Sequence, residues 1–104
     1  MASVARPRCR VNVGVTGLTE AVARDGIPWF VEELAHRDYF SDVSARWDQG
    51  TEQVRLQLVV SDLDPNAVEL ELNDDLCDCI IASFAETDAE WDLEFVGVAV
   101  LGAV

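Results

Sequence analysis

Three cysteines and one histidine are the residues of this chain whose types and spacing could do chemistry. The thiols of Cys77 and Cys79 are separated by one residue, and a thiol pair can bind a soft metal ion or form a redox couple. The surrounding pattern is helical, however, and residues two apart on a helix point about 200° apart. The two thiols therefore diverge, and we expect them to pack as small apolar side chains.

The single histidine, His36, restricts catalysis further, because any Ser–His or Cys–His pair has to include it. The sequence specifies no nucleophile beside it, so we expect a helix-capping or surface role. All seven basic residues are arginine, which leaves no lysine for a Schiff base or a phosphate-binding GxxxxGK loop. We therefore predict no catalytic residue, no cofactor, no metal ligand and no enzymatic activity.

Acidic residues recur at three- and four-residue spacing on the second helical segment and form a stripe on one face, namely Glu71, Asp74, Asp75 and Asp78. Such a stripe could bind a divalent cation weakly or contact a basic partner. It lacks the Asp-x-Asp-x-Asp-Gly spacing of a calcium loop, and a solvated face is its more common role. The role of the stripe stays open at this point.

The composition predicts one acidic globular domain. The chain has 104 residues with a formal net charge of -13, and half of its residues are hydrophobic. We expect a short N-terminal extension over residues 1–8 and a single domain over residues 9–104. No apolar run approaches the roughly 20 residues that span a bilayer, and an odd number of cysteines without a leader pattern favours the cytoplasm.

The first half of the chain alternates between strand and helix patterns. Apolar residues alternate with polar or small ones over residues 9–16, which predicts a half-buried strand. A helical pattern follows up to Arg37, and Gly26 and Pro28 predict an interruption within that helix. We therefore expect a broken helix after the first strand.

Period-two patterns return over residues 41–47 and 54–60, and the residues between them, 48–51, are typical of a turn. A hairpin is the prediction for this region. Residues 67–73 can be read in two ways, because apolar residues recur every four positions from Val68 onward but also alternate with Glu69 and Glu71.

The first reading gives a helix over about Pro65–Glu86, begun by the Asp64–Pro65 pair. The second gives a strand followed by a helix over about 75–85, with residues 41–47 helical instead. A closing strand over 91–101 completes either version. The order strand, helix, hairpin, helix, strand predicts a ferredoxin-like α+β fold, in which a four-stranded antiparallel sheet carries both helices on one face.

Strand alternation places arginines on the outward face of this sheet, namely Arg8, Arg10, Arg46 and Arg55. Adjacent first and third strands would make Arg10 and Arg55 near neighbours. The aromatic residues Trp47, Trp91 and Phe95 are predicted to point inward, and the net charge repels phosphate, so we expect no nucleic-acid partner. A polar or acidic protein surface fits Arg10, Arg46 and Arg55 better.

The closing strand departs from simple alternation. Trp91, Leu93 and Phe95 should face the core, whereas Val96, Val98 and Val100 would form an apolar row on the opposite face of an edge strand. Such a row either pairs with a second copy or another protein, or belongs to a C-terminal tail that curls over its own sheet.

These features favour a non-catalytic protein-interaction or regulatory module that forms a homodimer through the closing strand, with Arg10, Arg46, Arg55, Val96, Val98 and Val100 as partner-binding residues. One alternative is an acidic mimic of nucleic acid that inhibits a basic protein. Another is a small enzyme or small-molecule sensor with a site at a dimer interface.

Overall fold

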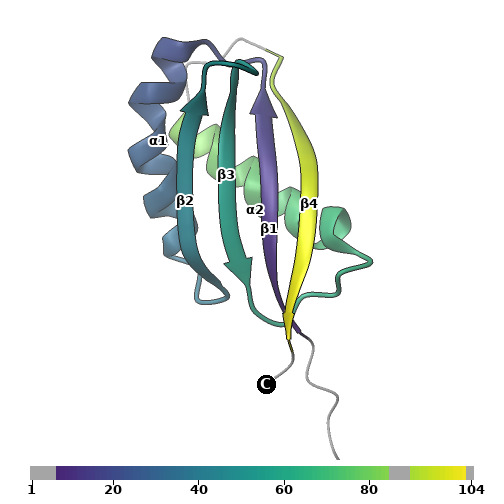
Figure 1. Cartoon of the computed structure of the whole chain (residues 1–104). Helices are drawn as coiled ribbons and strands as arrows, with labels where there is room; N and C mark the ends of the chain where they lie inside the picture. The colour runs from purple at the N-terminus through teal and green to yellow at the C-terminus, as the bar shows by residue number, and fades with distance from the viewer. Residues whose placement is uncertain (1–6, 85–89, 103–104) are drawn as a thin grey trace, which may run out of the picture.

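The computed structural model describes residues 7–84 and 90–102 of the chain. The six elements follow one another as β1 (Arg8–Thr16), α1 (Glu20–Ala35), β2 (Phe40–Asp48), β3 (Gln53–Val60), α2 (Val68–Ser83) and β4 (Asp92–Gly102). All neighbouring strands are antiparallel, in the order β2-β3-β1-β4, and both helices lie on one face of the sheet (Figure 1). The predicted ferredoxin-like α+β fold is confirmed.

The core lies between the sheet and the two helices. On β1 the alternation brings every second residue inward, and Cys9, Val11, Val13 and Val15 are at most 1% exposed. Directly opposite them on β3 lie Val60, Leu58, Leu56 and Val54, which are also buried. Phe30 and Leu34 from α1 and Leu72, Leu76 and Ile80 from α2 complete the apolar layer. The aromatic residues predicted to point inward, Trp47, Trp91 and Phe95, pack against this core while partly buried.

The helix α1 corrects one prediction, because it runs without a break from Glu20 to Ala35 although it contains Gly26 and Pro28. Proline removes its own N–H donor, and its ring crowds the carbonyl group one turn earlier. The buried side chains of Ala23, Phe30 and Leu34 nevertheless hold both halves of α1 on the sheet. At the start of α1, the side chain of Thr19 accepts a hydrogen bond of 3.3 Å from the backbone N–H of Val22.

Gly26 does not interrupt α1 but allows another residue to pack closely against the helix. It is buried against the ring of Phe84, which follows α2 and itself lies 5.4 Å, centroid to centroid, from the ring of Phe30. A Cβ atom at Gly26 would come within 2.2 Å of Cδ1 of Phe84. The glycine therefore allows Phe84 to fill the space between the two helices.

The segment for which the sequence allowed either a helix or a strand is helical. Residues from Val68 onward belong to α2, and the strand alternative is wrong. Val68, Leu72, Leu76 and Ile80 are buried at four-residue spacing, whereas Leu70 is 84% exposed. The helix begins three residues after Pro65, because Asp64 to Ala67 form a turn in which Oδ1 of Asp64 accepts from the backbone N–H of Asn66 at 3.0 Å. The helix ends at Ser83, and the predicted end at Glu86 lies outside the described residues.

Neither α1 nor α2 is long and apolar enough to cross a membrane, and the same holds for every helix within residues 7–84 and 90–102.

We predict that Gly26→Ala destabilises the protein by about 1–3 kcal/mol, the usual cost of overpacking a core. At an unobstructed helix position the same substitution would stabilise by up to about 1 kcal/mol. The free energy of unfolding from urea titration measures the difference. Gly50→Ala is the matched control, because the nearest heavy atom to its new Cβ would lie at 3.5 Å. A gain in stability for Gly26→Ala would contradict the packing role.

Candidate functional site

The strand β4 forms one edge of the sheet and pairs with β1 in a register that slips twice. Asn12 lies opposite Gly97 and Val13 opposite Phe95, so that Val96 is an extra residue without a partner on β1. The same happens at Leu101, because Cys9 lies opposite Val100 and Arg8 opposite Gly102. Each extra residue is a β-bulge, which shifts the inward and outward alternation by one position.

The bulge at Val96 corrects the predicted orientation of the apolar row. Directly opposed residues in an antiparallel pair point to the same face, and Val98 and Val100 lie opposite the buried Val11 and Cys9. Val98 and Val100 therefore face the helix side of the sheet, as Phe95 does, instead of the opposite side. Simple alternation misses this change, because it counts along one strand and cannot detect an extra residue in the pairing.

The helices leave this part of the inner face uncovered. In the view of Figure 1, α2 crosses obliquely behind the sheet and its first turn extends beyond β4. An open groove of about 880 Å³ lies between them, lined by Val68 and Leu70 from α2 and by Leu93, Phe95 and Val98 from β4. Glu69, Asn73 and Asp74 also line it, so the groove combines an apolar strand wall with a polar, acidic helix wall.

Exposed apolar side chains follow β4 up to the second bulge. Val100 is 55% exposed and Val98 is 37% exposed, and Val96 and Leu101 are exposed as well. No charged residue occurs from Phe95 to Gly102, in a chain with 20 acidic and 7 basic residues. We call Val96, Val98, Val100 and Leu101 the β4 edge surface. It is an uncharged, apolar strand edge on an otherwise strongly acidic protein.

The outer face of the sheet brings Arg46 and Arg55 together, as directly opposed residues of β2 and β3. The predicted proximity of Arg10 and Arg55 is wrong, because Arg55 lies opposite Gly14 of β1. Gly14 is four positions from Arg10, or about 13 Å at the usual rise per strand residue. The sequence did contain a signal from which the Arg46–Arg55 pair could be predicted. The length of the turn between β2 and β3 sets the register of the two strands and so determines which residues lie opposite each other.

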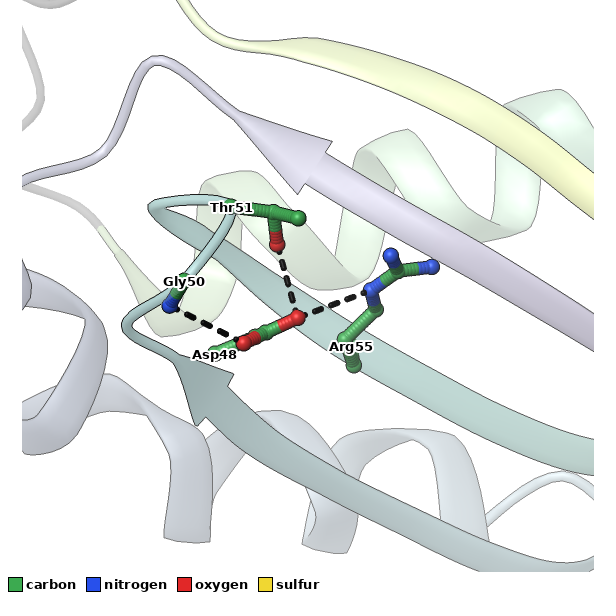
Figure 2. A network of polar contacts seen from close by, with 4 residues as sticks. All are labelled: Asp48, Gly50, Thr51 and Arg55. Atoms are coloured by element: carbon green, nitrogen blue, oxygen red, sulfur yellow. Dashed lines mark hydrogen bonds and ion pairs between the residues drawn. The ribbon is translucent and has the colours of Figure 1, made fainter.

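A turn network fixes the orientation of Arg55 (Figure 2). One carboxylate oxygen of Asp48, Oδ1, accepts from the backbone N–H of Gly50 at 3.1 Å. The other, Oδ2, accepts from the Thr51 hydroxyl at 2.8 Å and from Nε of Arg55 at 3.4 Å. The Thr51 hydroxyl, followed by the Gly50 N–H and Arg55, holds the pKa of Asp48 below its ordinary value.

The cysteines lie in or beside the core, and the histidine lies at the end of a helix. Cys79 is buried in the core and Cys77 is partly buried, and burial raises the pKa of both thiols. His36 is exposed and is the C-cap residue of α1. In the described part of the chain, no group of three or more His, Cys, Asp and Glu side chains is arranged to hold a metal ion.

The predicted acidic stripe is partly engaged within the fold. Asp75 accepts from the Tyr39 hydroxyl at 2.6 Å and lies 3.5 Å from Nε of Arg37. The side chain of Glu71 accepts from the backbone N–H of Asp64 at 3.2 Å. These contacts tie α2 to the segments that precede β2 and α2, while Asp74 and Asp78 remain exposed. The stripe is therefore not a uniform solvated face.

No protein-family model matches the chain, and no curated protein is significantly similar to it. The candidate functional surfaces therefore rest on the geometry of β4 and of the Arg46–Arg55 pair.

We predict that Asp48→Asn lowers the free energy of unfolding at pH 7, and that this loss shrinks below about pH 4. A carboxyl group whose pKa is lowered by folding stabilises the native state above its unfolded pKa, and loses that effect as the pH falls through the folded value. Urea titrations at pH 7 and pH 3 measure the two differences. Asp25→Asn, at an exposed position on α1, should leave stability unchanged at both values. An equal loss at pH 7 and pH 3 would contradict the role of the Asp48 carboxylate.

Proposed function

We propose that this protein is a non-catalytic interaction or regulatory module that self-associates through β4. The observation that carries the proposal is the β4 edge surface, which is apolar, exposed and free of charge in a chain of net charge -13. Two copies that met through any strongly acidic face would repel each other. The β4 edge surface is a place where two copies can approach at little electrostatic cost.

The pairing that fits this surface is antiparallel contact between β4 and its equivalent in a second copy. A two-fold axis perpendicular to the sheet would then join two four-stranded sheets into one and satisfy backbone groups left free at each edge. The residues between the two bulges, 97–100, form the regular part of this edge. Because each bulge interrupts regular pairing, we expect a short strand contact supported by side-chain burial.

The groove between β4 and α2 provides the apolar side chains that the second copy would bury. With a continuous sheet, the helices of both copies lie on the same face, and the first turns of the two α2 helices approach each other across the axis. Those turns carry Glu69 and Glu71, so repulsion between them opposes the apolar contact and is weakened by salt. Leu70 projects from that turn and is 84% exposed. Contact with the second copy would remove Leu70, Val98 and Val100 from water, at roughly 25 cal/mol for each Å² of apolar surface.

The free thiols support a reducing compartment such as the cytoplasm as the place of action. The cysteines Cys9, Cys77 and Cys79 are all free, and Cys9 and Cys79 are buried.

We predict that Val98→Glu and Val100→Glu each convert a dimer into a monomer, with at least a hundredfold weaker association. An isologous interface would contain the new carboxylate twice, buried and without a cationic partner. Light scattering coupled to size-exclusion chromatography measures the mass. Ile81→Glu is the matched control, because it replaces another exposed apolar residue on the distal part of α2 and should leave the dimer intact.

A urea titration of each variant establishes that the monomer remains folded. A wild-type protein that is monomeric at all concentrations, or a dimer that Val98→Glu and Val100→Glu leave unchanged, would overturn the proposal.

We also predict that salt strengthens the self-association. Each copy carries a net charge of -13, and at 0.3 M salt the Debye length falls well below its value of about 10 Å at 0.1 M. Sedimentation equilibrium at 0.03 M and 0.3 M NaCl should give a smaller dissociation constant at the higher concentration. An association that weakens with salt would indicate attraction between opposite charges and contradict contact through the uncharged edge.

A further inference from the structure

The cross-strand pair of Arg46 and Arg55 places two positive charges directly opposite each other on the outer face of the sheet. Like charges at opposed positions destabilise an antiparallel pair. Asp48 is an acidic neighbour of both arginines, because it accepts a hydrogen bond from Arg55 and the charge of Arg46 also lowers its pKa. Within residues 7–84 and 90–102, the ion pairs include Arg55 with Asp48 but none that involves Arg46.

A small hollow of about 150 Å³ adjoins this pair on the same face. Its polar lining consists of Asn12, Ser44, Arg46, Arg55 and Gln57. The hollow is large enough to hold several water molecules, and therefore a carboxyl group with a short alkyl chain. The side-chain amides of Asn12 and Gln57 and the Ser44 hydroxyl can donate hydrogen bonds beside the two guanidinium groups.

The Asp48 turn contacts only one side of the Arg55 guanidinium group. Asp48 contacts Nε of Arg55, and Figure 2 shows the two terminal nitrogens directed away from that carboxylate. Two terminal guanidinium nitrogens can form a parallel pair of hydrogen bonds with an oxyanion. Since Asp48 is itself held by Thr51 and Gly50, the guanidinium is oriented before any ligand arrives.

We propose that Arg46 and Arg55 bind a carboxylate in this hollow. Two arginines and Asp48 leave one net positive charge, which a singly charged carboxylate neutralises and a phosphate dianion would exceed. On the same face, Glu94 is opposite Gly14, two strands or about 10 Å from Arg55, and reinforces the preference for the smaller charge. Arg10 lies farther along β1 and does not line the hollow.

The carboxylate can belong to a free small acid or to an acidic side chain of another protein. Sodium propionate represents the first source, and a short capped peptide with one glutamate between two glycines represents the second. Tighter binding of the peptide assigns the site to a protein partner, whereas equal binding assigns it to a small acid. Sodium phosphate tests whether the site prefers a singly charged carboxylate to a doubly charged anion.

The experiment follows the NMR signals of the ¹⁵N-labelled full chain while each probe replaces NaCl at constant ionic strength. We expect saturable shifts of the backbone amides at 44–46 and 55–57 and of the Nε–H of Arg55, with weaker binding of phosphate. Arg46→Gln should weaken carboxylate binding about tenfold or more, as expected for the loss of a charge-assisted hydrogen bond. Arg24→Gln removes the same charge from exposed α1 and should leave the affinity unchanged.

A second measurement separates binding from structure. Arg46 faces the like charge of Arg55 at the opposed position and forms no ion pair within 4 Å with Asp48, although it attracts that carboxylate. Arg46→Gln should therefore leave the melting temperature nearly unchanged or raise it while it weakens binding. A clear loss of stability in Arg46→Gln would assign the pair a structural role and overturn the proposal. Shifts that do not saturate, an equal effect of Arg24→Gln, or tighter binding of phosphate would overturn it as well.

Discussion

The pairing of β1 with β3 on one side and β4 on the other is the interaction on which the rest of the structure depends. The inward residues of β1 are almost completely buried, and both helices pack over them and their partners on β3. Among the described strands, β4 pairs with β1 alone. The register of that contact therefore decides which residues of β4 reach the core and which remain accessible.

Charge divides the remaining surface into parts with different chemistry. Repulsion among 20 acidic residues opposes contact between copies over most of the molecule. The stretch from Phe95 to Gly102 carries no charge, so two copies can meet there without that repulsion. On the other side of the sheet, the opposed pair of Arg46 and Arg55 gathers two of seven arginines around a hollow. The β4 edge surface and the arginine hollow are thus supported by different strands, so a partner at one leaves the other free.

The spacing of apolar residues predicted helices and strands correctly where buried positions repeat regularly along a single element. The four-residue spacing of Val68, Leu72, Leu76 and Ile80 correctly favoured a helix for α2, and alternation correctly located the strands. The same reasoning failed at Gly26 and Pro28, because residues that usually end a helix are tolerated where tertiary packing supports both halves. It also failed for Val98 and Val100, since the bulge at Val96 reverses the faces beyond it.

The sequence by itself determined the order of the elements, the identity of the core residues and the absence of lysine chemistry, because each depends on residue type or on spacing along one element. Only the tertiary structure decided the faces of Val98 and Val100, the groove beside α2 and the distance between Arg10 and Arg55. These depend on how strands remote in the chain are aligned and on how α2 crosses the sheet. Such alignment reflects the packing of many side chains at once, and a pattern within a single segment does not contain it.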